Sequence, residues 1–146
     1  MNKIVTALFL LLLLLSAIYV SQGKFSGKEI RLGMSGPFSG SKKNLGQEML
    51  MGAQAYFKGI NTQGGVFGRY IKIITRDDRY EPNLAIENAK KFINDDKIFA
   101  FFGLIGTPTA KVILPIALEH NIPVIGTFSG ANFLRKPAHS QCPCWI

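Results

Sequence analysis

Residues 98–126 read IFAFFGLIGTPTAKVILPIALEHNIPVIG, and this stretch decides the fold. Its first five residues form a continuous apolar run, as expected for a strand that is covered on both faces. Thr107 and Pro108 are typical of a helix start, and we expect the helix to reach about His120. Pro115 should remove one backbone hydrogen bond and kink that helix. Residues 124–126 form the next strand, so the stretch predicts a strand–helix–strand unit.

The same alternation runs upstream and extends over residues 29–130. Strands are predicted at residues 29–34 (EIRLGM) and 70–75 (YIKIIT). A helix is predicted at residues 41–61, and a second begins at Glu81 and Pro82 and ends at residues 95–97. One buried face of the first helix is defined by Leu45, Met49, Gly52 or Ala53, Tyr56 and Ile60. The chain is therefore predicted to be an α/β protein with a Rossmann-like parallel sheet flanked by helices.

Small-residue turns follow the strand ends of this sheet. They lie at residues 35–40, 77–81, 103–109 and 126–130, and a parallel sheet places them on one edge. Ligands bind at that edge in open parallel sheets. The glycines of residues 64–68 follow a helix instead, and they are interpreted as a helix end and a tight turn.

Thr107 and Thr109 are the sharpest candidates for ligand contact. A helix N-terminus offers unpaired N–H groups and partial positive charge, and neighbouring hydroxyls can add hydrogen bonds to a carboxylate. The alternative is that Thr107 only caps the helix, which is compatible with ligand contact. The glycines at 103–107 match neither phosphate-binding fingerprint.

Other polar residues are interpreted structurally. Asp77 and Asp78 could be taken for a catalytic pair, but adjacent strand residues point to opposite faces, so Asx-type turn bonds are favoured. Ser39 and Ser129 have no plausible His and Asp partners, and His120 is expected to be solvated beside the helix end. No triad, metal cluster or acid–base pair is recognised, which argues against an enzyme and against a cofactor.

Composition narrows the function further. The chain has 146 residues, with 17 Lys and Arg against 9 Asp and Glu. The bases are scattered without interleaved aromatics, so nucleic-acid binding is not expected. Cys142 and Cys144 are too close for an unstrained disulfide, and with His139 they match no zinc spacing.

The N-terminus predicts an export signal at residues 1–23. Lys3 precedes an apolar run at residues 4–20, and Ser21, Gln22 and Gly23 form a small-x-small pattern with cleavage before Lys24. The alternative is an uncleaved membrane anchor. In both cases the protein is expected to work outside the inner membrane.

Four segments, taken in order, resemble one known family. They are KEIRLGMSGPFSG (28–40), GQEMLMGAQAYFKGIN (46–61), GGVFGRYIKIITRDDRYEPNLAIENAKKFI (64–93) and FFGLIGTPTAKVILPIALEHNIPVIG (101–126). Together they resemble the type I periplasmic binding proteins, closest to the leucine/isoleucine/valine-binding branch. The resemblance covers about residues 28–136.

This resemblance implies a substrate-binding component of an ABC importer for a branched-chain amino acid or a similar small solute, located in the periplasm. It implies two α/β lobes with the ligand between them, and a membrane permease as the partner of the full-length form. Residues 24–136 correspond to part of the N-terminal lobe, while residues 137–146 do not resemble the family's continuation. A truncated chain that binds weakly or not at all alone is therefore expected.

The ligand-binding residues implied by the resemblance lie in three turns: Ser35, Phe38 and Ser39; Thr107 and Thr109; and Phe128, Ser129 and Gly130. Apolar Leu104, Ile105 and Phe128 leave the class of ligand open. Two alternatives remain: the extracellular ligand-binding sensor domain of a receptor, and an enzyme of flavodoxin-like architecture.

Overall fold

The computed structural model describes residues 29–134 and shows a four-stranded parallel sheet. The strands are β1 (Ile30–Gly36), β2 (Ile71–Asp77), β3 (Ala100–Phe102) and β4 (Val124–Ile125), in the order β2-β1-β3-β4. All pairings are parallel, which confirms the predicted α/β class. The expectations for residues 1–23 and 137–146, including both cysteines, lie outside the described residues.

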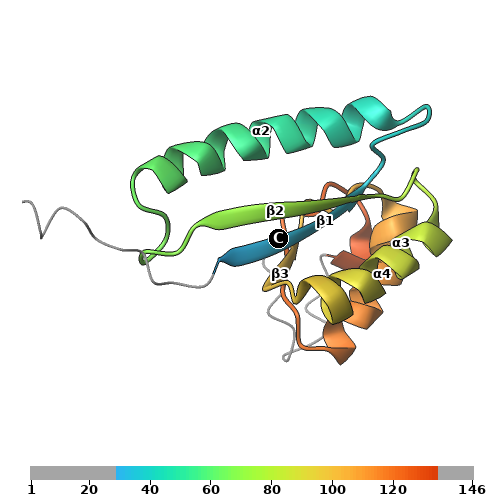
Figure 1. The fold of residues 1–146 in the computed structure, drawn as a ribbon. Coiled ribbons are helices and arrows are strands. Elements are labelled where there is room, and N and C mark those ends of the chain that lie inside the picture. Colours follow the sequence, from blue (N-terminus) through green and yellow to red (C-terminus); the bar gives the residue numbers. More distant parts are fainter. Residues whose placement is uncertain (1–28, 135–146) are drawn as a thin grey trace, which may run out of the picture.

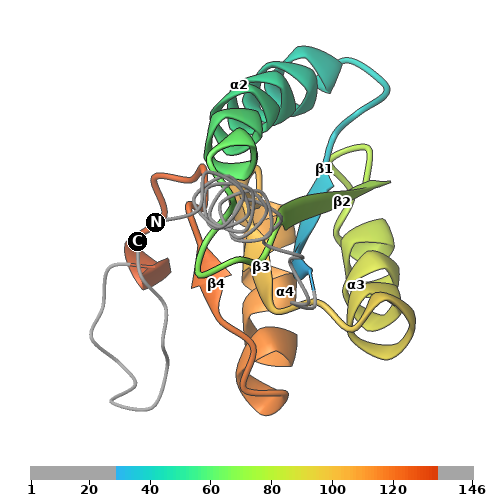
Figure 2. The same ribbon diagram turned by 60° about the vertical axis from the view of Figure 1, so that its left-hand side comes forward.

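Helices cover the two faces of the sheet. Helix α2 (Lys43–Thr62) lies on one face, and α3 (Pro82–Lys91) and α4 (Thr107–Glu119) lie on the other (Figure 1 and Figure 2). Strand–helix–strand connections in a parallel sheet are right-handed. In the order β2-β1-β3-β4, the chain moves from β1 outward to β2 and then back past β1 to β3, so these two connections run in opposite directions across the sheet. The second connection therefore places α3 on the face opposite α2. None of these helices, within residues 29–134, has the length and apolar character needed to cross a membrane.

The main core lies between the sheet and the α3–α4 layer. Phe92 and Phe101 meet edge-on at its centre with their ring centroids 6.1 Å apart. Four alanines of the two helices, Ala85, Ala89, Ala110 and Ala117, are buried in this core together with Leu104 and Ile113. Leu104 and Ile105 are both 1% exposed, so these two apolar residues are part of the packed interior.

Helix α2 is turned slightly from the predicted orientation: Met49, Ala53 and Ile60 are partly buried, as predicted, but Leu45 and Tyr56 are not. Tyr56 is 69% exposed and Leu45 is 39% exposed, so neither belongs to the buried face that the spacing predicted. Instead Gly46 is buried against the turn after β1, and a Cβ there would lie 2.2 Å from the carbonyl oxygen of Pro37. Phe57 packs edge-on against Phe102 of β3. The close approach at Gly46 fixes the rotation and turns the neighbouring Leu45 outward.

Several boundaries also differ from the predictions. Strands β1 and β2 are longer at their carboxyl ends, because Ser35 and Gly36 pair with Arg76 and Asp77. The segment after α3 is a π-helical turn, Phe92–Asp96, which ends where Lys97 adopts a φ of 52°. Strand β3 begins later than predicted, and β4 is only two residues long. Pro115 lies inside the single helix α4.

A 3₁₀ turn, Asn132–Leu134, follows β4 and completes the described chain.

Candidate functional site

The carboxyl ends of the four strands lie on one edge of the sheet, as predicted. A pocket of about 410 Å³ opens there, which is within the range of about 300–1,000 Å³ that small-molecule sites occupy. Three of the four predicted turns contribute to it. Its lining residues are Tyr80, Gly106, Thr107, Thr127, Phe128, Ser129 and Gly130.

The polar part of this pocket is the start of α4. Thr107 is the first helical residue and Pro108 follows it, so the N–H groups of Thr107 and Thr109 have no partner within the helix. The Thr107 and Ser129 hydroxyls are 2.8 Å apart, and the Ser129 hydroxyl also accepts the Ala131 N–H at 3.2 Å. This arrangement presents two hydroxyls beside the positive end of a helix, which suits a carboxylate.

Backbone hydrogen bonds hold the two turns of the pocket together. The Gly106 N–H donates to the Phe128 carbonyl at 3.1 Å, and the Phe128 N–H donates to the Leu104 carbonyl at 2.8 Å. These bonds extend the β3–β4 pairing beyond the sheet. Phe128 is thereby fixed through its backbone while the residue as a whole is 61% exposed.

Thr109 is placed differently from Thr107. Its side chain is 1% exposed, and its hydroxyl lies 2.7 Å from the Ile105 carbonyl, to which it donates. The hydroxyl is therefore used within the first turn of α4. At this position only the backbone N–H is available to a ligand on the edge.

Ser35, Phe38 and Ser39 do not line the pocket of Thr107 and Ser129. Ser35 is fully buried, and its hydroxyl donates to Oδ2 of Asp78 at 2.8 Å and accepts Nδ2 of Asn88 at 3.2 Å. Phe38 and Ser39 form a separate turn after β1. The structure thus brings together the predicted residues of the last two turns, and it places those of the first turn in another group of contacts.

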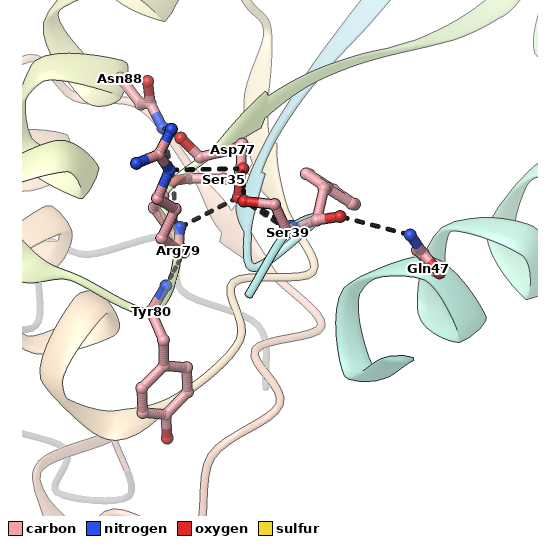
Figure 3. Close-up of polar contacts among 9 residues, drawn as sticks. Ser35, Ser39, Gln47, Asp77, Arg79, Tyr80 and Asn88 are labelled. Atoms are coloured by element: carbon pink, nitrogen blue, oxygen red, sulfur yellow. Dashed lines mark hydrogen bonds and ion pairs between the residues drawn. The ribbon is translucent and has the colours of Figure 1, made fainter. Parts of the chain in front are cut away.

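Asp77 organises that other group (Figure 3). Its Oδ1 accepts the backbone N–H of Phe38 at 2.8 Å and of Arg79 at 3.0 Å, and its Oδ2 accepts the Ser39 hydroxyl. Partial burial raises the pKa of Asp77, but the bonds from the Ser39 hydroxyl and three backbone N–H groups outweigh it. The pKa therefore lies below its usual value, and the carboxylate stays ionised while it ties the β1–α2 turn to the end of β2.

Asp78 faces the opposite side and is fully buried. Burial raises its pKa, the bonds from the Ser35 hydroxyl and the Tyr80 N–H oppose this, and the charge of Asp77 adds to the rise. Asp77 accepts the N–H of Arg79, and Asp78 accepts that of Tyr80 at 2.9 Å. These are the Asx-type bonds that the sequence favoured over a catalytic pair.

Three lining residues, Tyr80, Gly106 and Thr127, were not among the predicted ligand-binding residues, and Tyr80 has the largest side chain of the three. It lies in the predicted edge turn at 77–81, but its direction there depends on two consecutive left-handed residues, Arg79 with φ 50° and Tyr80 with φ 67°. Its ring lies against Gly106, where a Cβ would be 2.4 Å from Cε2. Its position after Asp77 and Asp78, both turn-forming, was the signal that could have indicated it.

Two further expectations concern histidine and metal sites. Nδ1 of the exposed His120 lies 3.0 Å from the Ile116 carbonyl at the end of α4, which confirms its placement beside the last helical carbonyls. Across residues 29–134, His, Cys, Asp and Glu side chains form no group of three that could hold a metal ion.

Comparison with known proteins places the chain in a family. The family model described as "Periplasmic binding protein" matches residues 29–142. An "Amino acid binding protein" of Pseudomonas aeruginosa is 32% identical over 75 residues, which cover 51% of this chain and 20% of that protein.

Solved structures agree with this match. A possible leucine/isoleucine/valine-binding protein from Rhodopirellula baltica has a TM-score of 0.74 and 32% identity, covering 80% of this chain and 31% of that one. A solute-binding protein of an ABC transporter from R. palustris, in complex with benzoate, has a TM-score of 0.67 and 28% identity, covering 74% and 29%. The described fold is thus that of the type I periplasmic binding proteins, and the chain spans about a fifth to a third of the length of these relatives.

Proposed function

This chain belongs to the periplasmic binding protein family, and we propose that its pocket forms one wall of a cleft for an amino acid of the branched-chain type or a similar small carboxylate. The family is one of solute-binding proteins and not of enzymes. The observation that carries the proposal is the pair of Thr107 and Ser129 hydroxyls, 2.8 Å apart, at the first turn of α4. The two hydroxyls line one pocket beside the backbone N–H groups at a helix start, and these are the donor types that recognise a carboxylate.

The proposal extends to export and delivery. Residues 1–23 act as an export signal, and residues 24–136 form part of an N-terminal lobe. The loaded protein hands its solute to an ABC permease in the periplasm. A single wall leaves most of a ligand exposed to water, so the chain alone binds weakly.

The proposed class of solute is supported by what two relatives bind. The Pseudomonas protein is named an amino acid binding protein, and the R. palustris structure contains benzoate. Both solutes have a carboxylate. Thr107, Ser129 and the N-terminus of α4 bind the shared carboxylate, and the other lining residues contact the remainder of the ligand.

NMR titration of the purified full chain with leucine, isoleucine and valine tests the proposal, because it detects millimolar binding. Amide signals of Thr107, Ser129 and Gly130 should shift. The Thr107→Val variant should weaken binding by roughly twofold to tenfold, the equivalent of one lost hydrogen bond. Thr75→Val, at an exposed position of β2, is the matched control. Shifts that leave residues 107–130 unaffected, or equal affinity in the Thr107→Val variant, would contradict the proposal.

A further inference from the structure

We propose that Tyr80 is a specificity-determining residue of this pocket and that, with Phe128, it selects carboxylates with a flat aromatic group. The inference rests on the proposed function, because it assumes that the carboxylate binds at Thr107 and Ser129. It adds a preference within that class: an aromatic acid over an aliphatic one of the same size. The chain's own geometry at the end of β2 carries the argument.

The position of Tyr80 is imposed by the two carboxylates before it. Asp77 accepts the N–H of Arg79 at 3.0 Å, and Asp78 accepts that of Tyr80 at 2.9 Å. These bonds hold both residues in the left-handed region, which side chains other than glycine seldom adopt. Such a conformation persists only where surrounding contacts fix it. In Figure 3 the Tyr80 ring points away from the Asp77 group of contacts.

The ring then meets the start of α4. Gly106 has a φ of 98°, and a Cβ there would overlap the Tyr80 ring, so a glycine is needed on both grounds. The ring therefore lies directly beside Thr107, which follows Gly106 and bonds to Ser129. Within residues 29–134 the Tyr80 hydroxyl makes no hydrogen bond, and it is available to a ligand.

Phe128 supplies the second ring. It lines the same pocket from the turn after β4, and it is 61% exposed although its backbone is bonded to residues 104 and 106. A large aromatic side chain that is fixed at its backbone and exposed at a pocket is available for contact with a ligand. Aromatic groups prefer edge-to-face or offset contacts with other rings, which adds to the apolar area that they bury.

The remaining lining residues are uncharged. The seven residues that line the pocket include no Asp, Glu, Lys or Arg. Recognition of a carboxylate on this wall is therefore left to the Thr107 and Ser129 hydroxyls and the start of α4, and contact with the rest of the ligand to the two rings.

The test compares three probes on the purified full chain by NMR titration: benzoate, cyclohexanecarboxylate and leucine. Benzoate and cyclohexanecarboxylate share the carboxylate and the six-membered ring and differ in aromaticity. Benzoate should bind about threefold to tenfold more tightly than cyclohexanecarboxylate, which is the range expected for one or two ring contacts. This comparison needs no variant and so does not depend on how a substitution affects folding.

Two variants assign the preference to Tyr80. Tyr80→Leu should reduce the preference for benzoate over cyclohexanecarboxylate to the part that Phe128 supplies, while Tyr80→Phe should retain the full preference. Phe67→Leu is the matched control, because Phe67 is also aromatic, also left-handed with φ 49° and fully exposed away from the pocket.

The outcomes separate this inference from the function on which it rests. Leucine binding without a benzoate preference, or a preference that is undiminished in Tyr80→Leu, would overturn the role of Tyr80 and leave the carboxylate site standing. A loss in Tyr80→Phe as large as that in Tyr80→Leu would show that the ring is not the determinant. No shift at residues 107–130 with any of the three probes would overturn both proposals.

Discussion

Replacement of Asp77 should separate the two parts of its role. In Asp77→Asn one side-chain oxygen remains to accept the backbone N–H groups of Phe38 and Arg79, and the acceptor for the Ser39 hydroxyl is lost. In Asp77→Ala all of these bonds are lost. Hydrogen bonds to charged groups contribute about 1.5–3 kcal/mol each, less where water can replace them. With 31% of the side chain exposed, we expect losses of about 1 kcal/mol for Asn and about 3 kcal/mol for Ala.

Urea unfolding of the purified chain, followed by circular dichroism, measures these losses. Asp95→Asn, at an exposed position on the π-helical turn, is the control and should change the free energy of unfolding by less than about 0.5 kcal/mol. The pKa of Asp77 is lowered in the folded state, so its contribution is complete above the ordinary value of 3.8 and is lost as the pH falls through the lower folded value. The gap between wild type and Asp77→Asn should therefore narrow in acid. A gap that widens there, or equal losses for Asn and Ala, would refute the reasoning.

Three further predictions test other contacts of the same edge. Gly46→Ala should lower the free energy of unfolding by about 1–3 kcal/mol, because the added Cβ would meet the Pro37 carbonyl. Gly52→Ala in the same helix is the control: its Cβ would meet nothing within 4 Å, so it should raise the free energy of unfolding by about 0.5–1 kcal/mol. Thermal melts compare the two variants. Burial raises the pKa of Asp78, so its stabilising contribution is present below pH 3.8 and is lost as the pH rises through the folded value, and Asp78→Asn should remove that pH dependence from urea midpoints measured between pH 4 and 7. Gly106→Ala, at φ 98°, should displace the Tyr80 ring, which a loss of nuclear Overhauser contacts between residues 80 and 106 would report.

The element order of the fold could be predicted because each unit has a strong local signal. The continuous apolar run before Gly103, the Thr107 and Pro108 helix start, and the periodicity of α3 all depend on residues close in sequence. The side of the sheet on which each helix lies then follows from the handedness of the connections. The local signals gave the class, the element order and the edge on which the pocket lies.

Strand ends and helix rotation could not be predicted in the same way, since both depend on partners distant in sequence. Ser35 and Gly36 look like a turn, yet they continue β1 because Arg76 and Asp77 pair with them. The rotation of α2 is decided by one contact between Gly46 and Pro37, in which an absent side chain matters more than the apolar residues beside it. Periodicity predicts that Leu45 and Tyr56 are core residues, because it does not take account of the backbone contact between Gly46 and Pro37.

The candidate site also contains residues that local sequence could place and residues that it could not. Thr107, Phe128, Ser129 and Gly130 were found because they follow strand ends directly, and the sheet places strand ends together. Thr109 shares that turn, but a helical residue two positions on points back into the packed first turn, where its hydroxyl bonds to the Ile105 carbonyl. Sequence spacing places a residue on the correct edge and does not decide whether its side chain faces the pocket or the interior.

The two adjacent carboxylates show why a residue's chemistry and its place in a site need separate arguments. Asp77 and Asp78 are the most chemically suggestive residues of the edge, yet their oxygens are occupied by the Ser39 and Ser35 hydroxyls and by the N–H groups of the two residues that follow. Their pKa values are displaced in opposite directions because one accepts several donors near water while the other is buried. Neither pattern leaves an oxygen directed at the pocket. These bonds place the ring of Tyr80 at the pocket, so Asp77 and Asp78 affect a ligand only through the Tyr80 side chain that they position.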